Sequence, residues 1–264
     1  MDSKAVKAIL FDLDNTLIET SRAGGVAIQK TSELLKTSLA LDDDSVRSIC
    51  DKFKQKLLHE SFDPSAGRSI DQLRVSHWEE SIQEVEESIQ EVEESIQEVE
   101  ESIQEVEESR CTPSLAAQCY YCWKNSRLEI LSLSPEICHL LTDLRSRYKL
   151  LLLTNGETQT QREKVEAARC EEFFDAVVIG GEHAEQKPFV SIFTLCFNML
   201  EVEARDCVMV GDSLDTDIQG GFNAGVRATV WISAAGGSVP EGSVKPDYTV
   251  PSVLELPHIL QQLK

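Results

Sequence analysis

The chain has 264 residues, of which 41% are hydrophobic, so it is long enough to form a proper core in one large domain or in a domain with a sizeable insertion. Its formal net charge of −21 comes from 46 acidic and 25 basic residues. Because an acidic chain repels phosphate backbones, we expect no nucleic-acid binding, although a small anionic substrate fits if a few cations are placed locally.

The N-terminus does not predict secretion or membrane insertion. It has no long apolar run before a small-residue cleavage site, and no stretch approaches the roughly 18–20 apolar residues of a membrane span. Among the eight cysteines only Cys119 and Cys122 form a close pair, and this pair lacks the second pair that a zinc site needs. We therefore expect free thiols in a cytoplasmic protein that makes no membrane contact.

Strand and helix patterns divide the chain into three parts. A short apolar run at residues 4–11 predicts a buried strand, and residues 19 to about 130 then predict helices only. From about residue 135 onward, helical patterns alternate with apolar runs at 150–153, 176–179, 207–210 and 228–232. Such alternation is typical of a parallel sheet covered on both faces. We predict an α/β fold: a doubly wound, Rossmann-like core of residues 1–18 and 131–264 with an all-helical insertion, residues 19–130.

The heptad SIQEVEE occurs four times without a change in residues 81–108. Its Ile and Val residues alternate at spacings of three and four, which predicts a helix. The segment holds twelve Glu and no Lys or Arg, so the rest of the chain has 25 basic and 34 acidic residues. Because neighbouring Glu side chains repel each other, we expect a solvated, partly frayed extension. A helix that supports weak association with a partner, and an error in the sequence, are the alternatives.

Two carboxylates follow the first predicted strand. Asp12 and Asp14 are two residues apart, so in an extended chain both side chains lie on one side. Ligands of open parallel sheets bind at the carboxyl ends of the strands. Two adjacent carboxylates repel each other unless they share a cation, so the pair indicates a cation or ligand site.

The later strands end in residues of the same kind. Thr154, Asn155 and Gly156 offer a hydroxyl, an amide and backbone N–H groups at the start of a helix, which suits a phosphate. Lys187 places a cation after the third strand. The fourth strand ends in a cluster formed by Asp212, Asp215 and Asp217. Carboxylates, phosphate donors and a lysine are thus expected at one edge of the sheet.

In order along the chain, DLDNT at 12–16, TNG at 154–156, KP at 187–188 and GDSLDTD at 211–217 resemble the motifs of the haloacid dehalogenase-like hydrolase superfamily. The helical insertion is similar to the cap of that superfamily. The resemblance implies that Asp12 attacks phosphorus, and that Asp14 protonates the leaving oxygen and then activates water. It also implies a Mg²⁺ ion held by Asp12, the Asp14 backbone carbonyl and Asp212.

The resemblance assigns further roles at the strand ends. It implies phosphate contacts from Leu13, Asp14, Asn15, Thr154, Asn155 and Lys187. Asp217 is expected to orient metal-bound water or Lys187, and Asp215 to be solvated. Dehalogenases lack an acid at the position of Asp14, and ion-pumping ATPases have Thr there. Asp14 therefore favours a phosphatase or a phosphomutase.

Stretches such as DQLRVSHWEE and GDSLDTDIQGGFNAGVRATVWI are similar to phosphatases that act on sialic acids phosphorylated at the terminal carbon. A phosphorylated sugar acid is therefore the expected substrate, and its carboxylate requires a cation in the cap. The candidates are Arg22, Arg68, Arg74 and Arg127. His77 and Trp78 either line the sugar pocket or pack in the cap core. Another metabolite phosphatase, a phosphomutase and an inactive interaction scaffold are the alternative functions.

Overall fold

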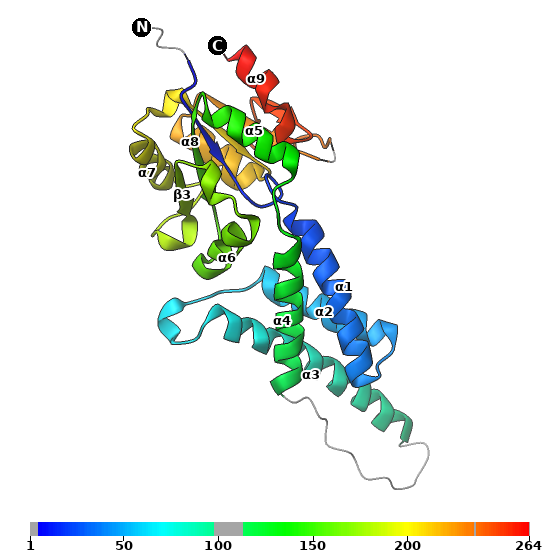
Figure 1. Cartoon of the computed structure of the whole chain (residues 1–264). Helices are drawn as coiled ribbons and strands as arrows, with labels where there is room; N and C mark the ends of the chain where they lie inside the picture. Colours follow the sequence, from blue (N-terminus) through cyan, green and yellow to red (C-terminus); the bar gives the residue numbers. More distant parts are fainter. Residues whose placement is uncertain (1–4, 98–112, 235, 264) are drawn as a thin grey trace. The chain divides into compact units, whose positions relative to one another are not determined.

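The computed structural model describes residues 5–97, 113–234 and 236–263 and divides the chain into two compact units (Figure 1). One unit consists of Met1–Ser21 and Leu128–Lys264, and the other of Arg22–Arg127. Among the described residues, all strands belong to the first unit, whereas the second contains helices and loops. No helix in the described part of the chain is long and apolar enough to cross a membrane.

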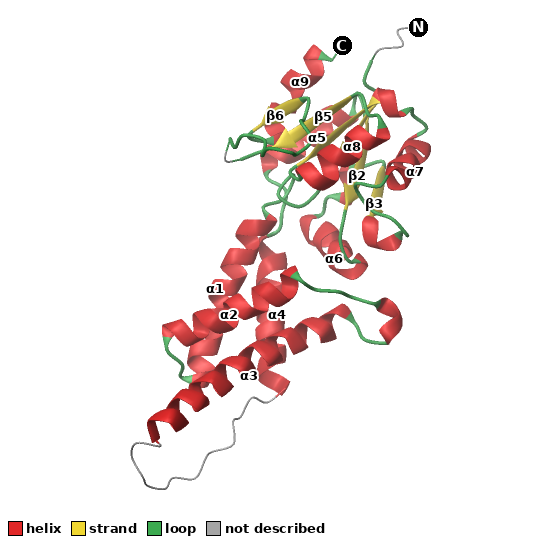
Figure 2. Ribbon diagram, turned by 180° about the vertical axis from the view of Figure 1, so that it is seen from behind, coloured by secondary structure: helices red, strands yellow, loops and turns green. Residues whose placement is uncertain are grey.

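Parallel strands form the sheet of the first unit, in the order β3-β2-β1-β4-β5-β6. They are β1 Ala8–Phe11, β2 Lys149–Thr154, β3 Ala176–Ile179, β4 Cys207–Gly211, β5 Ala228–Ile232 and β6 Tyr248–Val250. The predicted parallel sheet is confirmed, and the five predicted apolar runs are its first five strands (Figure 2). The sequence pattern misses β6, because its three residues are too few to show a period.

Helices flank this sheet. They are α5 Pro135–Arg145, α6 Thr158–Ala168, α7 Val190–Leu200, α8 Gln219–Ala224 and α9 Leu256–Gln262. Successive side chains of a strand point to opposite faces: Leu10 packs in one cluster with Phe193 of α7, whereas Phe11 meets Phe174 edge to face, with ring centroids 6.1 Å apart. Both faces of β1 are therefore covered, and β1 is completely buried.

The order of the strands reverses at β1. The chain builds β2 and β3 on one side of β1 and then returns to place β4 on its other side. In register, Phe11 pairs with Leu152 of β2 and with Val210 of β4. In open sheets of this kind, ligands bind at the carboxyl ends of the strands where the order reverses, and here these are the ends of β1 and β4.

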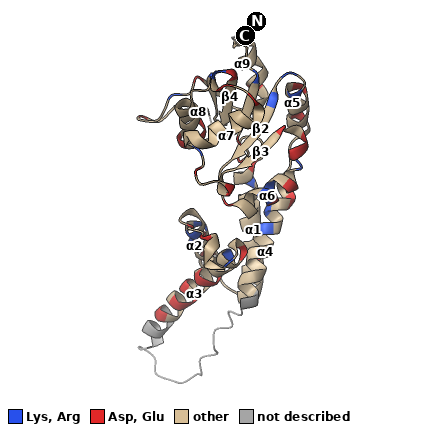
Figure 3. Cartoon of the chain, turned by 90° about the vertical axis from the view of Figure 1, so that its left-hand side faces the viewer, with Lys and Arg blue, Asp and Glu red and all other residues tan. Residues whose placement is uncertain are grey.

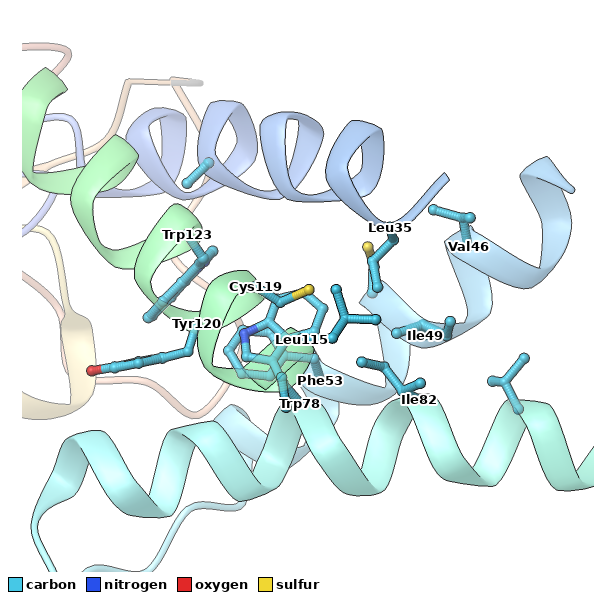
Figure 4. Close-up of a cluster of buried hydrophobic side chains, with 14 residues drawn as sticks. Leu35, Val46, Ile49, Phe53, Trp78, Ile82, Leu115, Cys119, Tyr120 and Trp123 are labelled. Atoms are coloured by element: carbon cyan, nitrogen blue, oxygen red, sulfur yellow. The ribbon is translucent and has the colours of Figure 1, made fainter. Parts of the chain in front are cut away.

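The second unit consists of helices packed around an aromatic core. Its helices are α1 Thr20–Leu39, α2 Asp43–Leu58, α3 Ile70–Gln97 and α4 Pro113–Ile130, of which α1 and α4 continue into the first unit. Phe53 of α2 stacks on Trp78 of α3 with centroids 4.0 Å apart, and Trp123 of α4 meets Phe53 edge to face at 5.3 Å (Figure 4). The pair Cys119 and Cys122 lies on α4 as free thiols, as expected.

The first heptad of the repeat is part of this core, so the expected solvated extension is wrong for residues 81–87. Ile82 is fully buried, Val85 is 5% exposed and Ile89 packs against the same cluster. These residues continue, at spacings of three and four, the apolar stripe that Val75 and Trp78 begin. Residues 98–108 of the repeat lie outside the described residues.

Helix α2 supplies the cations that the repeat lacks. Lys52 Nζ lies 2.7 Å from Glu84, and Lys56 Nζ lies 2.9 Å from both Glu80 and Glu84. Acidic side chains nevertheless follow one another along α3 (Figure 3). The repulsion between these Glu residues is thus offset in the first heptad by a neighbouring helix, which the local sequence does not reveal.

Candidate active site

Asp12 is placed by the end of the central strand. Its backbone N–H donates to the carbonyl of Val210 at 2.9 Å, which extends the pairing of β1 with β4 by one residue. The side chain is held at both oxygens: Oδ1 accepts from Lys187 Nζ at 2.7 Å, and Oδ2 accepts from the Thr16 hydroxyl at 3.2 Å. Only 6% of the residue is exposed, so this carboxylate has a fixed position at the edge of the sheet.

Lys187 is the central cation of the site. Its side chain is 1% exposed, and its Nζ donates to Asp12 Oδ1, to Asp217 Oδ1 and to the carbonyl of Leu153, each at 2.7 Å. These three acceptors match the three donors of an ammonium group. Burial alone would lower the pKa of Lys187, but the two carboxylates raise it above its ordinary value. Lys187 is therefore charged and joins the ends of three strands.

Asp217 is held against the end of β4 by a short π-helix, Leu214–Ile218. Besides the contact with Lys187, its Oδ2 accepts from the backbone N–H of Ser213 at 3.0 Å. A Cβ atom at position 211 would overlap this carboxylate, so the glycine at the end of β4 is required for the close approach. Asp217 thus contacts Lys187, whereas Asp215 is exposed.

Asp12, Asp212 and Asp217 form a cluster that could bind a metal ion. Each offers an oxygen, and the three oxygens lie within 4.8 Å of one another. The Trp231 indole N–H donates to the Asp212 carbonyl at 2.8 Å and anchors that residue. Oxygen ligands of this kind suit hard divalent cations such as magnesium or calcium.

The electrostatics of the cluster also fit a cation. Burial raises the pKa of Asp12 to about 7, with a contribution from Asp217, although Lys187 acts in the opposite direction. Burial and the nearby Asp217 likewise raise the pKa of Asp212 to about 6. Three carboxylates therefore crowd around the positive charge of Lys187, and a further cation would relieve their repulsion.

The expected phosphate donors fall into two groups in the structure. The Thr154 hydroxyl lies in the site and accepts from Gln161 Nε2 at 2.6 Å. The Asn155 side chain instead bridges to the loop of Lys187: its Nδ2 donates to the Lys187 carbonyl at 2.8 Å, and its Oδ1 accepts from the Lys187 N–H at 3.0 Å. The side chain of Asn155 therefore positions Lys187, and its backbone N–H remains the candidate phosphate donor.

Asn15 is held in the turn after β1 by hydrogen bonds to Ile18 and Ser21. Its N–H donates to the carbonyl of Ile18 at 2.7 Å, and its Oδ1 accepts from the Ser21 N–H at 2.9 Å. The backbone has a φ of 56° there, in the left-handed region that Asn adopts more readily than most residues. Asn15 therefore shapes the turn after β1 through its N–H and Oδ1, and its phosphate contact stays a prediction.

Sequence reasoning misses the residues that hold Asp14. Lys164 Nζ lies 2.8 Å from both oxygens of this carboxylate, Gln161 Nε2 lies 3.0 Å from Oδ2, and the Thr20 hydroxyl lies 2.5 Å from Oδ1. Burial would raise the pKa of Asp14, but the Lys164 charge and these hydrogen bonds hold it below its ordinary value. The i, i+3 spacing of Gln161 and Lys164 could have shown that the two share a helix face, but not that this face meets Asp14.

Four of the expected sugar contacts have partners within the helical unit. Arg74 forms an ion pair with Glu60, with Nη2 and Oε1 2.8 Å apart, and the two side chains are 12% and 11% exposed. Trp78 is fully buried and stacks on Phe53, so it packs in the core. The Arg127 guanidinium lies 4.5 Å from the centre of the Trp123 ring, and Arg68 donates to the Gln72 carbonyl at 2.9 Å.

Known proteins match the whole chain. The family model described as haloacid dehalogenase-like hydrolase covers residues 6–225. N-acylneuraminate-9-phosphatases of Rattus norvegicus and Homo sapiens are each 44% identical to this chain over 263 residues, which is 100% of this chain and 97% of each relative. The solved structure of the HAD-hydrolase YfnB from Bacillus subtilis, 20% identical, covers 97% of this chain and 99% of its own with a TM-score of 0.63, which shows a shared fold.

Proposed function

Because this chain belongs to the haloacid dehalogenase-like hydrolases and is a phosphoric monoester hydrolase closely similar to N-acylneuraminate-9-phosphatases, we propose that it converts N-acylneuraminate 9-phosphate to N-acylneuraminate and phosphate. The observation that carries the mechanism is the Asp12 carboxylate, held by Lys187 beside Asp212 and Asp217 at the end of the central strand. The identity over the full chain supports the substrate.

In the proposed reaction Asp12 is the nucleophile. One of its oxygens forms a bond to phosphorus while the bond between phosphorus and the sugar oxygen breaks. The leaving sugar oxygen takes a proton from Asp14. In the second step Asp14 accepts a proton from water as the water oxygen bonds to the phosphorus. The bond between phosphorus and Asp12 then breaks, which releases phosphate and restores the Asp12 carboxylate.

Magnesium is the proposed cofactor. Asp12, Asp212 and the backbone carbonyl of Asp14 would hold it, with the carboxylate of Asp217 close by. When bound, the ion screens the repulsion between the Asp12 carboxylate and the dianionic phosphate. Lys187 would stabilise the negative charge of the transferring oxygens, and it is already fixed for this role by Asp217 and the Leu153 carbonyl.

The remaining phosphate contacts come from groups at the ends of β1 and β2. We assign them to the backbone N–H groups of Leu13, Asp14 and Asn155 and to the hydroxyl of Thr154. Preorganised donors of this kind act on charge that develops in the transition state. Asn155 contributes a second time because its side chain fixes the backbone of Lys187 on both sides.

The two units divide these tasks. The unit that contains the sheet provides the catalytic groups, and we propose that the helical unit is a cap that selects the sugar. Arg74 is already paired with Glu60, so we propose one of the other candidate arginines for the sugar carboxylate. Arg22, Arg68 and Arg127 remain, and single substitutions by Met should raise KM for a sugar acid phosphate without changing KM for p-nitrophenyl phosphate if one of them binds the carboxylate.

A phosphate-release assay across phosphorylated metabolites tests the function. With magnesium, the purified protein should hydrolyse N-acylneuraminate 9-phosphate with a clearly higher kcat/KM than glycolate phosphate, hexose phosphates and nucleotides, and Asp12→Asn should abolish the release. Similar kcat/KM values for all substrates would leave a general phosphatase and disprove the specific substrate. Isomerised sugar phosphate without free phosphate would instead identify a phosphomutase.

A further inference from the structure

Helix α6 holds the Asp14 carboxylate from one side. Lys164 Nζ lies 2.8 Å from each of its oxygens, and Gln161, one turn earlier on α6, donates to Oδ2 at 3.0 Å. The Lys164 side chain is 9% exposed, whereas that of Asp14 is 27% exposed. The carboxylate is therefore fixed on its inner side and stays accessible on its outer side.

Gln161 connects this contact to the phosphate site. Its Nε2 also lies 2.6 Å from the Thr154 hydroxyl and 2.6 Å from the Asn155 carbonyl, and the residue is 2% exposed. A movement of α6 would thus shift Asp14 and the end of β2 together. Side chains buried at this depth are restricted to few rotamers, which gives the carboxylate a defined direction.

The burial of Lys164 requires compensation. An ammonium group that leaves water loses hydration energy, and a carboxylate with good hydrogen-bond geometry offsets that loss. Here the ammonium lies at equal distances from both Asp14 oxygens. A contact to both oxygens restricts rotation of the carboxylate about its terminal bond, which a contact to one oxygen would not do.

We propose that Lys164, supported by Gln161, is a positioning residue that sets the orientation in which Asp14 transfers protons. The inference rests on the proposed acid and base roles of Asp14. Lys164 does not need to touch the substrate, so its loss should lower kcat and leave KM nearly unchanged. A misdirected catalytic group costs up to about 100-fold in rate, and we expect a decrease in kcat of about 10- to 100-fold for Lys164→Met.

Arg162 offers a matched control on the same helix. Its Nε and Nη2 donate to Glu182 at 2.8 and 2.7 Å, so it forms an ion pair of similar geometry that does not involve Asp14. Arg162→Met should leave kcat unchanged. Lys164→Arg retains the charge and should restore part of the rate lost in Lys164→Met, because a guanidinium can also contact both oxygens of a carboxylate.

A double-mutant cycle on the full chain decides the question. We would measure kcat for Lys164→Met, Asp14→Asn and the double variant with the preferred phosphorylated substrate, and monitor folding by circular dichroism. If Lys164 acts through Asp14, Lys164→Met should have little further effect once Asp14 is Asn. Equal effects of Lys164→Met in both backgrounds, or a decrease in Arg162→Met as large as in Lys164→Met, would overturn the inference.

The same cycle separates this inference from the proposed mechanism. Full activity of Asp14→Asn would refute the proposed roles of Asp14, whatever Lys164→Met does. An inactive Asp14→Asn together with a fully active Lys164→Met would leave the mechanism intact and refute the positioning role. If Lys164→Met does not fold, Lys164→Gln, which keeps a donor for Asp14, provides the comparison in the same cycle.

Discussion

Replacement of Ile82 by Ala should destabilise the helical unit far more than the same replacement at Ile89, although both residues occupy the same position of identical heptads. Ile82 is fully buried, whereas Ile89 is only partly buried. A buried Ile→Ala substitution costs about 2–5 kcal/mol, because packing contacts are lost and a cavity remains. The gain in helix propensity on replacing Ile by Ala is at most about 0.7 kcal/mol. It is the same for both variants, because their flanking sequences are the same, so it cancels in the comparison. We expect a cost on the order of 1 kcal/mol at Ile89.

Urea unfolding followed by tryptophan fluorescence measures this difference. Trp78 and Trp123 report on the helical unit, and a Trp231→Phe background removes the signal of the sheet. With a denaturant slope of about 2 kcal/mol per molar, a loss of about 3 kcal/mol lowers the midpoint for Ile82→Ala by about 1.5 M, against about 0.5 M for Ile89→Ala. Equal midpoint shifts would refute the conclusion that the first heptad belongs to the core.

Three further predictions concern the site. Lys187→Met leaves Asp12 and Asp217 buried without their shared cation, so turnover should vanish and the free energy of unfolding should fall by about 3–5 kcal/mol, measured by phosphate release and thermal unfolding. Gly211→Ala should abolish activity because the added methyl group overlaps the Asp217 carboxylate, whereas Gly24→Ala, which meets no atom, should retain it; an active Gly211→Ala would contradict the packing. The pKa values of Asp12 and Asp212 are raised to about 7 and about 6 in the folded, metal-free protein. Protonation of these two carboxylates therefore contributes fully to the free energy of unfolding below about pH 4, and this contribution is lost as the pH rises through 6 and 7. Magnesium, which binds the deprotonated forms, should therefore raise the Tm more at about pH 7.5 than at about pH 5.5, and a shift independent of pH would contradict the assignment.

The part of the site that lies at strand ends could be predicted from the sequence. Asp12, Lys187 and Asp212 each follow a continuous apolar run, and the parallel arrangement of such runs brings their ends to one edge of the sheet. The contacts of Asp14 could not be predicted in this way. Lys164 lies in the polar stretch TQREKVE and has the pattern of a solvated helix residue, and only the packing of α6 beside the turn after β1 gives it a partner.

Residue type alone did not predict the contacts of two asparagines, because the backbone geometry around them determines which groups they bind. Asn15 and Asn155 both carry groups that suit a phosphate, but the left-handed turn at Asn15 commits its N–H to Ile18. The Asn155 side chain is similarly committed to the Lys187 backbone. These hydrogen bonds depend on turns that join distant strands, and the local sequence pattern does not encode them.

The position of the first heptad in the core of the helical unit has a consequence for how insertions can lengthen the chain. Seven residues turn an α-helix through about 700°, which is only about 20° short of two full turns. A duplicated heptad therefore adds length to α3 while the stripe through Trp78, Ile82 and Val85 keeps facing α2, whereas an insertion of five or six residues beside it would rotate every later apolar side chain away. Duplication of a whole SIQEVEE heptad would therefore leave the existing core intact, because it keeps the apolar residues on nearly the same face of the helix.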